Sequence, residues 1–111
     1  MTIQRGDVFW VDPGPVRGNE QKGRRPCLVV SHESFNTRLG TVISLAITSK
    51  PPKTGFPLTW SLATGRLPRR SWVKIGHVRT FSTLRLGRRI GRVDEEEVDR
   101  IVEGLLDIVG P

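Results

Sequence analysis

Residues 18–30 read GNEQKGRRPCLVV, and this stretch joins two unlike segments. The apolar run from Pro26 to Val30 has the length and composition of a buried strand. The loop before it is crowded with polar and charged side chains, namely Asn19, Glu20, Gln21, Lys22, Arg24 and Arg25. A loop needs only a turn residue or two, so this density of hydrogen-bonding groups at the start of a core strand marks a candidate site.

Short strands are expected on both sides of this stretch. Apolar and β-branched runs bounded by turn residues predict strands over residues 6–12, 27–31, 41–47, 58–62, 71–78 and 88–92. Gly76 is expected to bend the fifth strand, and residues 81–86 to form a single helical turn. With 111 residues, the chain is expected to form one domain, residues 1–111, around a single core.

A helix is predicted at the end of the chain. Apolar residues recur there at three- and four-residue spacing and form one stripe that can pack on a sheet: Val98, Ile101, Val102, Leu105, Leu106 and Val109. Asp94 and Glu97 have the spacing of a helix cap, and the acidic block at 94–97 suits the positive end of the helix dipole. The block is therefore interpreted as a capped helix start, with a regulatory acidic tail as the alternative.

The net charge of +7 is unevenly distributed along the chain. Residues 1–93 contain 17 basic and 4 acidic side chains, and residues 34–93 contain no acidic one. Such a surface attracts polyanions, of which nucleic acid is the common one, although the charge can also serve solubility alone.

Several classes of protein are not expected from this sequence. No apolar run approaches the roughly 20 residues that a membrane-spanning helix needs, and the N-terminus lacks the pattern of a signal peptide. The single cysteine, Cys27, is interpreted as a core residue rather than a nucleophile, which fits a reducing cytoplasm. Cys27, His32 and His77 do not show the spacing of a metal site, so we expect no metal site and no cofactor.

The loop can be interpreted through the chemistry of RNA cleavage by the ribose 2′-OH. That reaction needs a group that accepts the 2′ proton, a group that protonates the leaving 5′ oxygen, and positive donors for the charge on phosphorus. Arg25, at the start of a strand, can offer its planar fork of donors to a phosphate, and Glu20 can orient it or accept a proton. Gly18 and Gly23 allow the loop to bend around a ligand. The same arginine and glutamate are also compatible with a plain surface ion pair.

The order of these motifs resembles the MazF/PemK family of toxin endoribonucleases. The segment RGDVFWVD is followed by a Pro-Gly-Pro turn, by GNEQKGRRPCLVVS and later by AITSK. The elements that carry the resemblance are Gly6, Asp7, Gly18, Glu20, Gln21, Gly23, Arg25 and Pro26. The resemblance is specific over the first 50 residues and looser beyond them, where the length and the terminal helix still agree.

The resemblance implies a fold, an activity and partners. The fold is an SH3-like antiparallel β-barrel of the MazF/PemK/CcdB type, mostly β with short helices and a C-terminal α-helix. The activity is sequence-specific, metal-independent cleavage of single-stranded RNA by a homodimeric cytoplasmic toxin, which would inhibit translation and growth. The chain would be neutralised by a cognate antitoxin, for which we expect an acidic segment, and no membrane partner is implied.

Site residues follow from the resemblance position by position. The family's catalytic arginine, hydroxyl and loop glutamate fall on Arg25, Thr48 and Glu20, with the last as base or as orienter of the arginine. Thr48 could also be a simple strand-end cap. The residues expected to bind RNA are Gly18, Asn19, Gln21, Lys22, Arg24, Ser49, His77 and Arg79. Residues 76–79 depart from the family pattern, so His77 can serve base recognition or be an ordinary edge residue, and the inherited base preference is open.

Two other functions are compatible with the sequence. By resemblance, the same fold also serves toxins that poison DNA gyrase by binding without cleaving RNA. A nucleic-acid-binding barrel without activity is the third possibility. The set of Glu20, Arg25 and Thr48 favours the ribonuclease, because a protein that only fills a groove on its target needs no such set.

Overall fold

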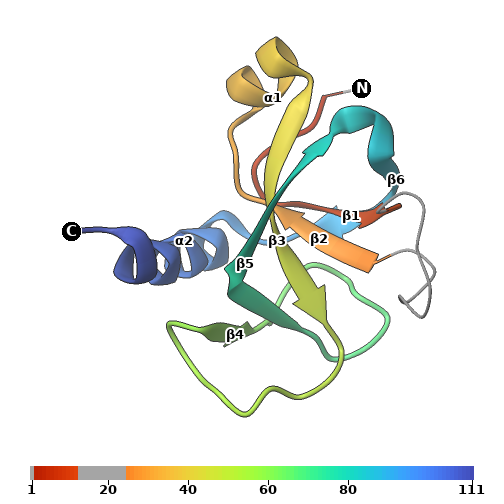
Figure 1. The fold of residues 1–111 in the computed structure, drawn as a ribbon. Helices are drawn as coiled ribbons and strands as arrows, with labels where there is room; N and C mark the ends of the chain where they lie inside the picture. Colours follow the sequence, from red (N-terminus) through yellow and green to blue (C-terminus); the bar gives the residue numbers. More distant parts are fainter. Residues whose placement is uncertain (1, 13–24) are drawn as a thin grey trace, which may run out of the picture.

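The computed structural model describes residues 2–12 and 25–111. In chain order the elements are β1 (Asp7–Val11), β2 (Arg25–Val29), α1 (Glu33–Leu39), β3 (Thr41–Thr48), β4 (Thr59–Ser61), β5 (Trp72–Ser82), the 3-10 turn η1 (Thr83–Arg85), β6 (Leu86–Arg92) and α2 (Glu95–Val109). The strands form one six-stranded sheet in the order β4-β5-β3-β2-β1-β6. All of its pairs are antiparallel. The sheet is strongly twisted but remains open, with β4 and β6 at its edges (Figure 1). The expected fold class is confirmed.

The predicted strands are all present with small changes at their ends. β2 begins at Arg25 rather than at residue 27, and β5 continues to Ser82 instead of ending at residue 78. The bend expected at Gly76 is also present as a register shift, because Leu45 pairs with Val78 while Ala46 pairs with Lys74. The single helical turn is η1.

Helix α1 was not expected from the sequence. Its seven residues contain little apolar surface, and its N-cap, His32, makes no side-chain capping bond. The helix is held by Asn36, which is 2 % exposed. The Asn36 amide donates to the Ile3 carbonyl at 2.9 Å and to the Ser31 carbonyl at 3.1 Å. Gly40, with φ of 67°, ends the helix in the left-handed conformation that glycine tolerates.

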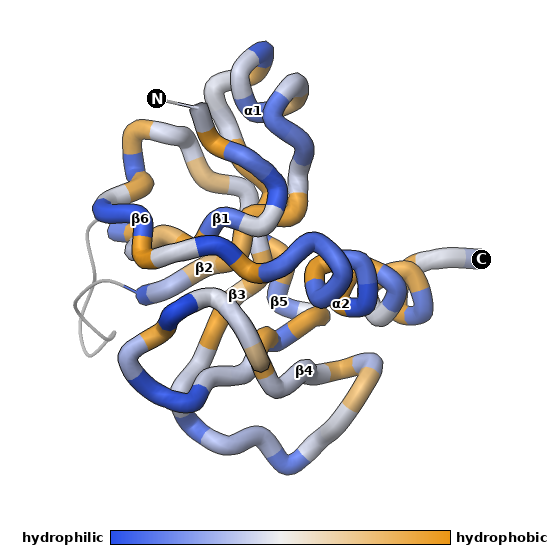
Figure 2. The backbone as a smooth tube through the Cα atoms, turned by 180° about the vertical axis from the view of Figure 1, so that it is seen from behind, coloured by the Kyte–Doolittle hydropathy of each residue, from blue (hydrophilic) through white to orange (hydrophobic). Residues whose placement is uncertain are grey.

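Two apolar clusters fill the faces of the sheet. The cluster beneath α2 consists of Val8, Leu28, Leu45, Ile47, Val73, Ile75, Val93, Val98 and Ile101. The cluster on the other face consists of Ile3, Phe9, Val11, Cys27, Val29 and Val42. Neighbouring residues of β1 and β2 therefore go to opposite faces, as the two-residue period of a strand requires. Hydrophobic and hydrophilic positions alternate along α2 in Figure 2, which fits a helix with one face on the sheet.

Asp7 has a structural role in the Gly6-Asp7 motif. Its carboxylate is buried, accepts the Gln4 N–H at 2.9 Å and accepts the Arg92 Nε–H at 3.0 Å. Gly6 adopts φ of 100°, and a Cβ there would stand 3.1 Å from the Val93 carbonyl oxygen. The motif thus joins the start of β1 to the end of β6 and lies outside the chemistry of the candidate site. No helix among the described residues is long and apolar enough to cross a membrane.

Glu97 does not cap α2 as expected. Asp94 is the N-cap, but it makes no side-chain capping bond. The Glu97 carboxylate instead accepts Trp60 Nε1–H at 2.7 Å, Ala63 N–H at 2.7 Å, Thr64 N–H at 3.0 Å and the Thr64 hydroxyl at 2.5 Å. Burial alone would raise the pKa of Glu97, but these hydrogen bonds outweigh it and lower the pKa below its ordinary value. Glu97 therefore ties the segment after β4 to the first turn of α2.

Replacing Glu97 with glutamine should destabilise the fold by about 1–3 kcal/mol at neutral pH. A glutamine has one acceptor oxygen, and its NH₂ group would face N–H donors. Because the pKa of Glu97 is lower in the folded state, its stabilisation is present above the unfolded pKa of about 4.3 and is lost as the pH falls through the folded value. Urea unfolding of E97Q and wild type should therefore differ at neutral pH and converge in acid. E103Q, an exposed change on the same helix, is the control; equal stability of E97Q and E103Q would contradict the assignment.

Candidate active site

The sheet register brings Arg25 and Thr48 together. β2 and β3 are antiparallel, with Cys27 opposite Ala46. Carried outward by two residues, this register sets Arg25 opposite Thr48 and on the same face of the sheet. On the other side of β2, Arg25 pairs with Val11 of β1. The arginine is therefore placed by the two neighbouring strands of the sheet.

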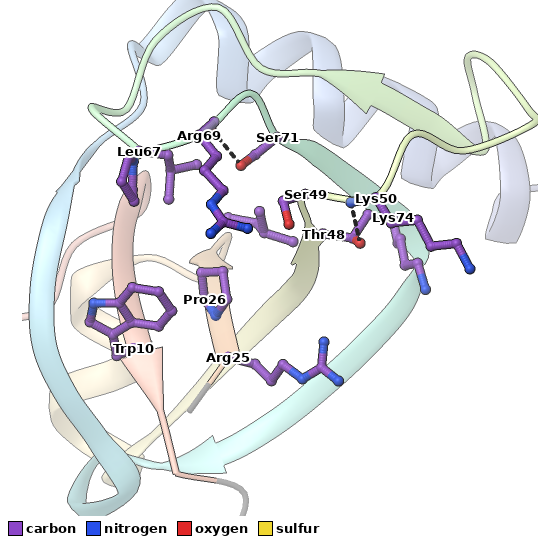
Figure 3. A pocket seen from close by; sticks show the side chains of 12 residues that line it. Trp10, Arg25, Pro26, Thr48, Ser49, Lys50, Leu67, Arg69, Ser71 and Lys74 are labelled. Carbon is purple, nitrogen blue, oxygen red and sulfur yellow. Dashed lines mark hydrogen bonds between the residues drawn. The ribbon is translucent and has the colours of Figure 1, made fainter. Parts of the chain in front are cut away.

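A cavity of about 820 Å³ lies at this end of the sheet. It is lined by Trp10, Arg25, Pro26, Ile47, Thr48, Ser49, Lys50, Leu67, Pro68, Arg69, Ser71 and Lys74. Four of these residues are cationic and none is acidic, so the cavity offers a positive potential to an anion. Figure 3 shows that the lining comes from β1, β2, β3 and β5, from the start of the loop after β3 and from the loop that precedes β5.

Arg25 is the exposed first residue of β2. Pro26 follows it, and a proline restricts the residue before it to extended backbone, which fixes the direction of the arginine stem. The Arg25 side chain makes no hydrogen bond or ion pair with any other described residue. Its five N–H donors are therefore available to a phosphate, within the part of the chain that the structure describes.

Thr48 is the half-buried last residue of β3. Its Oγ1 accepts the Lys50 N–H at 3.1 Å, the bond drawn as a dashed line in Figure 3. The strand-end cap that the sequence suggested is thus present, but in it the hydroxyl oxygen of Thr48 acts only as an acceptor. The O–H donor of Thr48 stays available for a phosphate oxygen in the cavity. Capping and ligand binding are therefore compatible at this residue.

Ser49, one of the residues expected to bind RNA, also lines the cavity, next to Thr48. Trp10, Lys50, Arg69 and Lys74 line it as well and were not identified from the sequence. The pairing of Trp10 with Pro26 brings this indole beside the site, a placement that depends on strand register. Arg69 comes from a distant loop, and in Figure 3 its side chain points into the cavity toward Pro26. The one available signal was the run of basic residues around position 69.

Arg79 and His77 are placed differently on β5. Arg79 lines a smaller hollow of about 130 Å³, which Arg25 also lines and which has Cys27 and Phe81 among its apolar walls. The Arg79 guanidinium lies 5.1 Å from the centre of the Phe81 ring. His77 is exposed and lines neither this hollow nor the larger cavity. The structure thus brings Arg25, Thr48, Ser49 and Arg79 around neighbouring hollows and leaves His77 outside them.

The remaining predicted site residues lie outside the described residues: Gly18, Asn19, Glu20, Gln21, Lys22 and Arg24. Among the described residues, no group of three His, Cys, Asp or Glu side chains could hold a metal ion. Cys27 is buried, and burial raises the pKa of its thiol to about 11, only partly offset by hydrogen bonds to Ser44 and Phe9. A thiol that stays protonated at neutral pH is a core residue and not a nucleophile, as expected.

Comparison with known proteins decides the family. The model of the PemK-like, MazF-like toxin of type II toxin–antitoxin systems matches residues 4–109. The chain belongs to this toxin family. Two relatives of MazF type cover almost the whole chain and are named for their activity. Endoribonuclease MazF6 of Mycobacterium tuberculosis (strain H37Rv) is 37 % identical over 114 residues, 97 % of this chain and 100 % of its own length. Endoribonuclease EndoA of Bacillus subtilis is 35 % identical over 107 residues, 95 % and 92 % of the two chains.

Solved structures share the MazF fold. MazF from Deinococcus radiodurans superposes with a TM-score of 0.78 at 23 % identity and covers 100 % of this chain and 99 % of its own. MazE–MazF from the same organism gives a TM-score of 0.82 at 23 % identity, and the match covers 99 % of this chain and 97 % of that one. A mycobacterial endoribonuclease in complex with its cognate antitoxin gives a TM-score of 0.79 at 22 % identity, and the match covers 97 % of this chain and 95 % of that one. At this identity the structures support the fold, and the family and its activity rest on the sequence relatives.

Proposed function

We propose that this chain, a MazF-type endoribonuclease toxin, cleaves single-stranded RNA at a defined sequence by attack of the ribose 2′-OH on the adjacent phosphate. One observation carries the proposal. Arg25, whose side chain bonds to no other described residue, and the Thr48 hydroxyl line the same cationic cavity. These groups supply donors for a phosphate and for the charge that grows on it. The family and the endoribonuclease relatives support the same substrate class.

In the proposed reaction the 2′ oxygen forms a new bond to phosphorus and the bond from phosphorus to the 5′ oxygen breaks. The 2′ proton passes to a base, and an acid protonates the leaving 5′ oxygen. Arg25 stabilises the negative charge on the non-bridging oxygens with its fork of donors, and Thr48 donates a further hydrogen bond. Glu20 is proposed as the base or as the residue that orients Arg25. The products are a 2′,3′-cyclic phosphate and a 5′-OH.

Cutting mRNA in this way would inhibit translation and growth, and the proposed place of action is the cytoplasm. We propose that the toxin works as a homodimer and that an acidic antitoxin segment blocks the cationic cavity. MazE–MazF and antitoxin complexes among the structural neighbours support this kind of partner.

Sedimentation at micromolar concentration should show a dimer, and antitoxin should displace RNA. A fully active monomer, or a ternary complex that still cleaves, would contradict these two points.

The purified protein should cut a mixed RNA at a limited set of sites, equally well with and without EDTA. Metal is not needed because Arg25 and its cationic neighbours supply the positive charge that the transition state requires. The measurement is sequencing of RNA 5′ ends after incubation, which also gives the recognised sequence. Loss of cutting in EDTA would contradict the mechanism. Intact RNA together with inhibition of DNA gyrase would favour the gyrase-poisoning alternative.

A further inference from the structure

The loop between β4 and β5, residues 62–71, carries three arginines, and the proposed reaction assigns an individual role to none of them. Arg66, Arg69 and Arg70 line a second cavity of about 310 Å³ on this loop. Arg69 lines the active-site cavity as well, and so do Leu67 and Pro68. The two cavities are therefore adjacent, and Arg69 is a cation common to both. We name the part on the loop the arginine track, defined by Arg66, Arg69 and Arg70.

The charges of the arginine track are not neutralised by the described part of the chain. None of the three arginines forms an ion pair with another described residue, and none of the described residues that line the two cavities is acidic. The Arg70 guanidinium lies 5.1 Å from the centre of the Trp72 ring. This contact holds the Arg70 side chain but does not neutralise its charge. Figure 2 shows strongly hydrophilic stretches along this loop, between β4 and β5. The track is therefore suited to phosphate groups spaced along a chain.

The loop is fixed in position by contacts that have no part in the candidate active site. Glu97 accepts the N–H groups of Ala63 and Thr64. The next residue, Gly65, lies so close to β6 that a Cβ on Gly91 would stand 2.5 Å from the Gly65 carbonyl oxygen. Arg66 itself holds a φ of 56°, which a residue with a side chain adopts only where its surroundings impose it. A loop fixed in this way can present cations at set positions with little loss of entropy on binding.

The surface beyond the track changes sign. Ala63 and Thr64 also border a cavity on the other side of the loop, which is lined by Asp94, Glu95, Glu96 and Arg100 among others. The acidic side chains there repel a phosphate chain, so the favourable path ends at the loop. An anion is thus attracted to the two cavities lined by Arg25, Arg69 and Arg66 and repelled by the acidic start of α2.

We propose that Arg66 and Arg69 bind phosphates of the RNA that lie outside the cleaved bond, so that the arginine track lengthens the footprint on the substrate. This inference rests on the proposed function, since it takes the occupant of the active-site cavity to be RNA. RNA suits the observations because it carries a phosphate at every nucleotide, and the cations of the track lie in a cavity adjacent to the cationic active-site cavity, with Arg69 lining both. Contacts to phosphates hold the RNA strand in place and do not distinguish one base from another.

The test compares wild type with the double variant R66Q/R69Q, which leaves Arg70 on Trp72. Binding to oligouridylates of increasing length is measured by fluorescence anisotropy over a series of salt concentrations. Each lost phosphate contact should reduce the slope of log K against log salt by about 0.7, so the double variant should lose about 1.4 for long oligomers. The loss of affinity should be smaller for oligomers too short to leave the active-site cavity. R38Q, with the same kind of charge change on α1, should bind as wild type does.

An unchanged salt slope in R66Q/R69Q, or an equal loss for the shortest and longest oligomers, would overturn the proposal. The proposal also fails if the variant binds RNA normally but loses affinity for polyglutamate, because the track would then serve an acidic protein partner. Failure of the proposed function gives a different result: wild type would cut no RNA in the sequencing experiment, whatever the variant does in the binding series. The two ideas can therefore fail separately.

Discussion

Replacing Arg25 with alanine is expected to lower the rate of RNA cleavage by about 100- to 1,000-fold, the usual loss when one donor to a transition-state oxyanion is removed. Arg25 is exposed at the first residue of β2, so the fold should be unaffected. The measurement is a single-turnover rate on an RNA that carries a mapped cleavage site, with thermal unfolding as a check of folding. Binding of the RNA should weaken much less than the rate, because several other cations line the same cavity.

Three variants make the arginine experiment specific. R25K should restore little activity, because an ammonium group lacks the planar fork that meets two phosphate oxygens. T48V should lose less activity than R25A, since it removes a neutral hydroxyl, both its donor and the acceptor of the Lys50 N–H, and keeps the side-chain shape. R38A removes an arginine on α1, away from the cavity, and should cut at the wild-type rate. A wild-type rate in R25A would exclude the proposed role of Arg25.

A substrate with 2′-deoxyribose at the nucleotide before the cut is expected not to be cleaved at all. The 2′ oxygen is the nucleophile of the proposed reaction, so its removal leaves nothing to attack phosphorus, whatever the protein does. The measurement is gel or sequencing detection of product after long incubation. The same oligonucleotide should still bind, with an affinity close to that of the all-ribose RNA, because the arginine and threonine contacts are to phosphate.

The control for this substrate is a 2′-deoxy substitution at a neighbouring nucleotide, which should leave cleavage intact. The products of the all-ribose RNA provide an independent check. The upstream fragment should end in a 2′,3′-cyclic phosphate, and the downstream fragment should accept a 5′ phosphate from a kinase because it begins with 5′-OH. A downstream fragment that already carries a 5′-phosphate would mean that water, and not the ribose, is the nucleophile.

The strands could be predicted from the sequence because they are apolar and β-branched runs bounded by turn residues, and α2 because its apolar residues recur at the helical period. α1 could not, since its stability comes from one buried side chain, Asn36, whose partners Ile3 and Ser31 lie on other segments. The hydrogen bonds of Glu97 could not be predicted for the same reason. Its spacing from Asp94 matched a local cap, but donors 33 to 37 residues away compete for the carboxylate and bind it. Local patterns do not reveal which of two partners a polar group will choose.

The candidate site was predictable in part for a related reason. Arg25 and Thr48 stand at the ends of two apolar strands, and an antiparallel pairing of those strands is enough to bring them together. Arg69 reaches the same cavity from a loop whose path depends on Glu97 and on the close approach of Gly65 to β6. Trp10 depends on register in the same way. Residues that reach a site through such long-range contacts leave no recognisable spacing in the sequence.

The change of sign on the two sides of the loop after β4 makes the molecule an electric dipole. Cations gather around Arg25 and the arginine track, while carboxylates gather at the start of α2. In the field of a polyanion such a body experiences a torque, so it turns its cationic end forward before contact is made. Orientation of this kind raises the association rate more than the affinity, and salt weakens it steeply. Moving charge from one end to the other, at constant net charge, would therefore alter how fast RNA is captured.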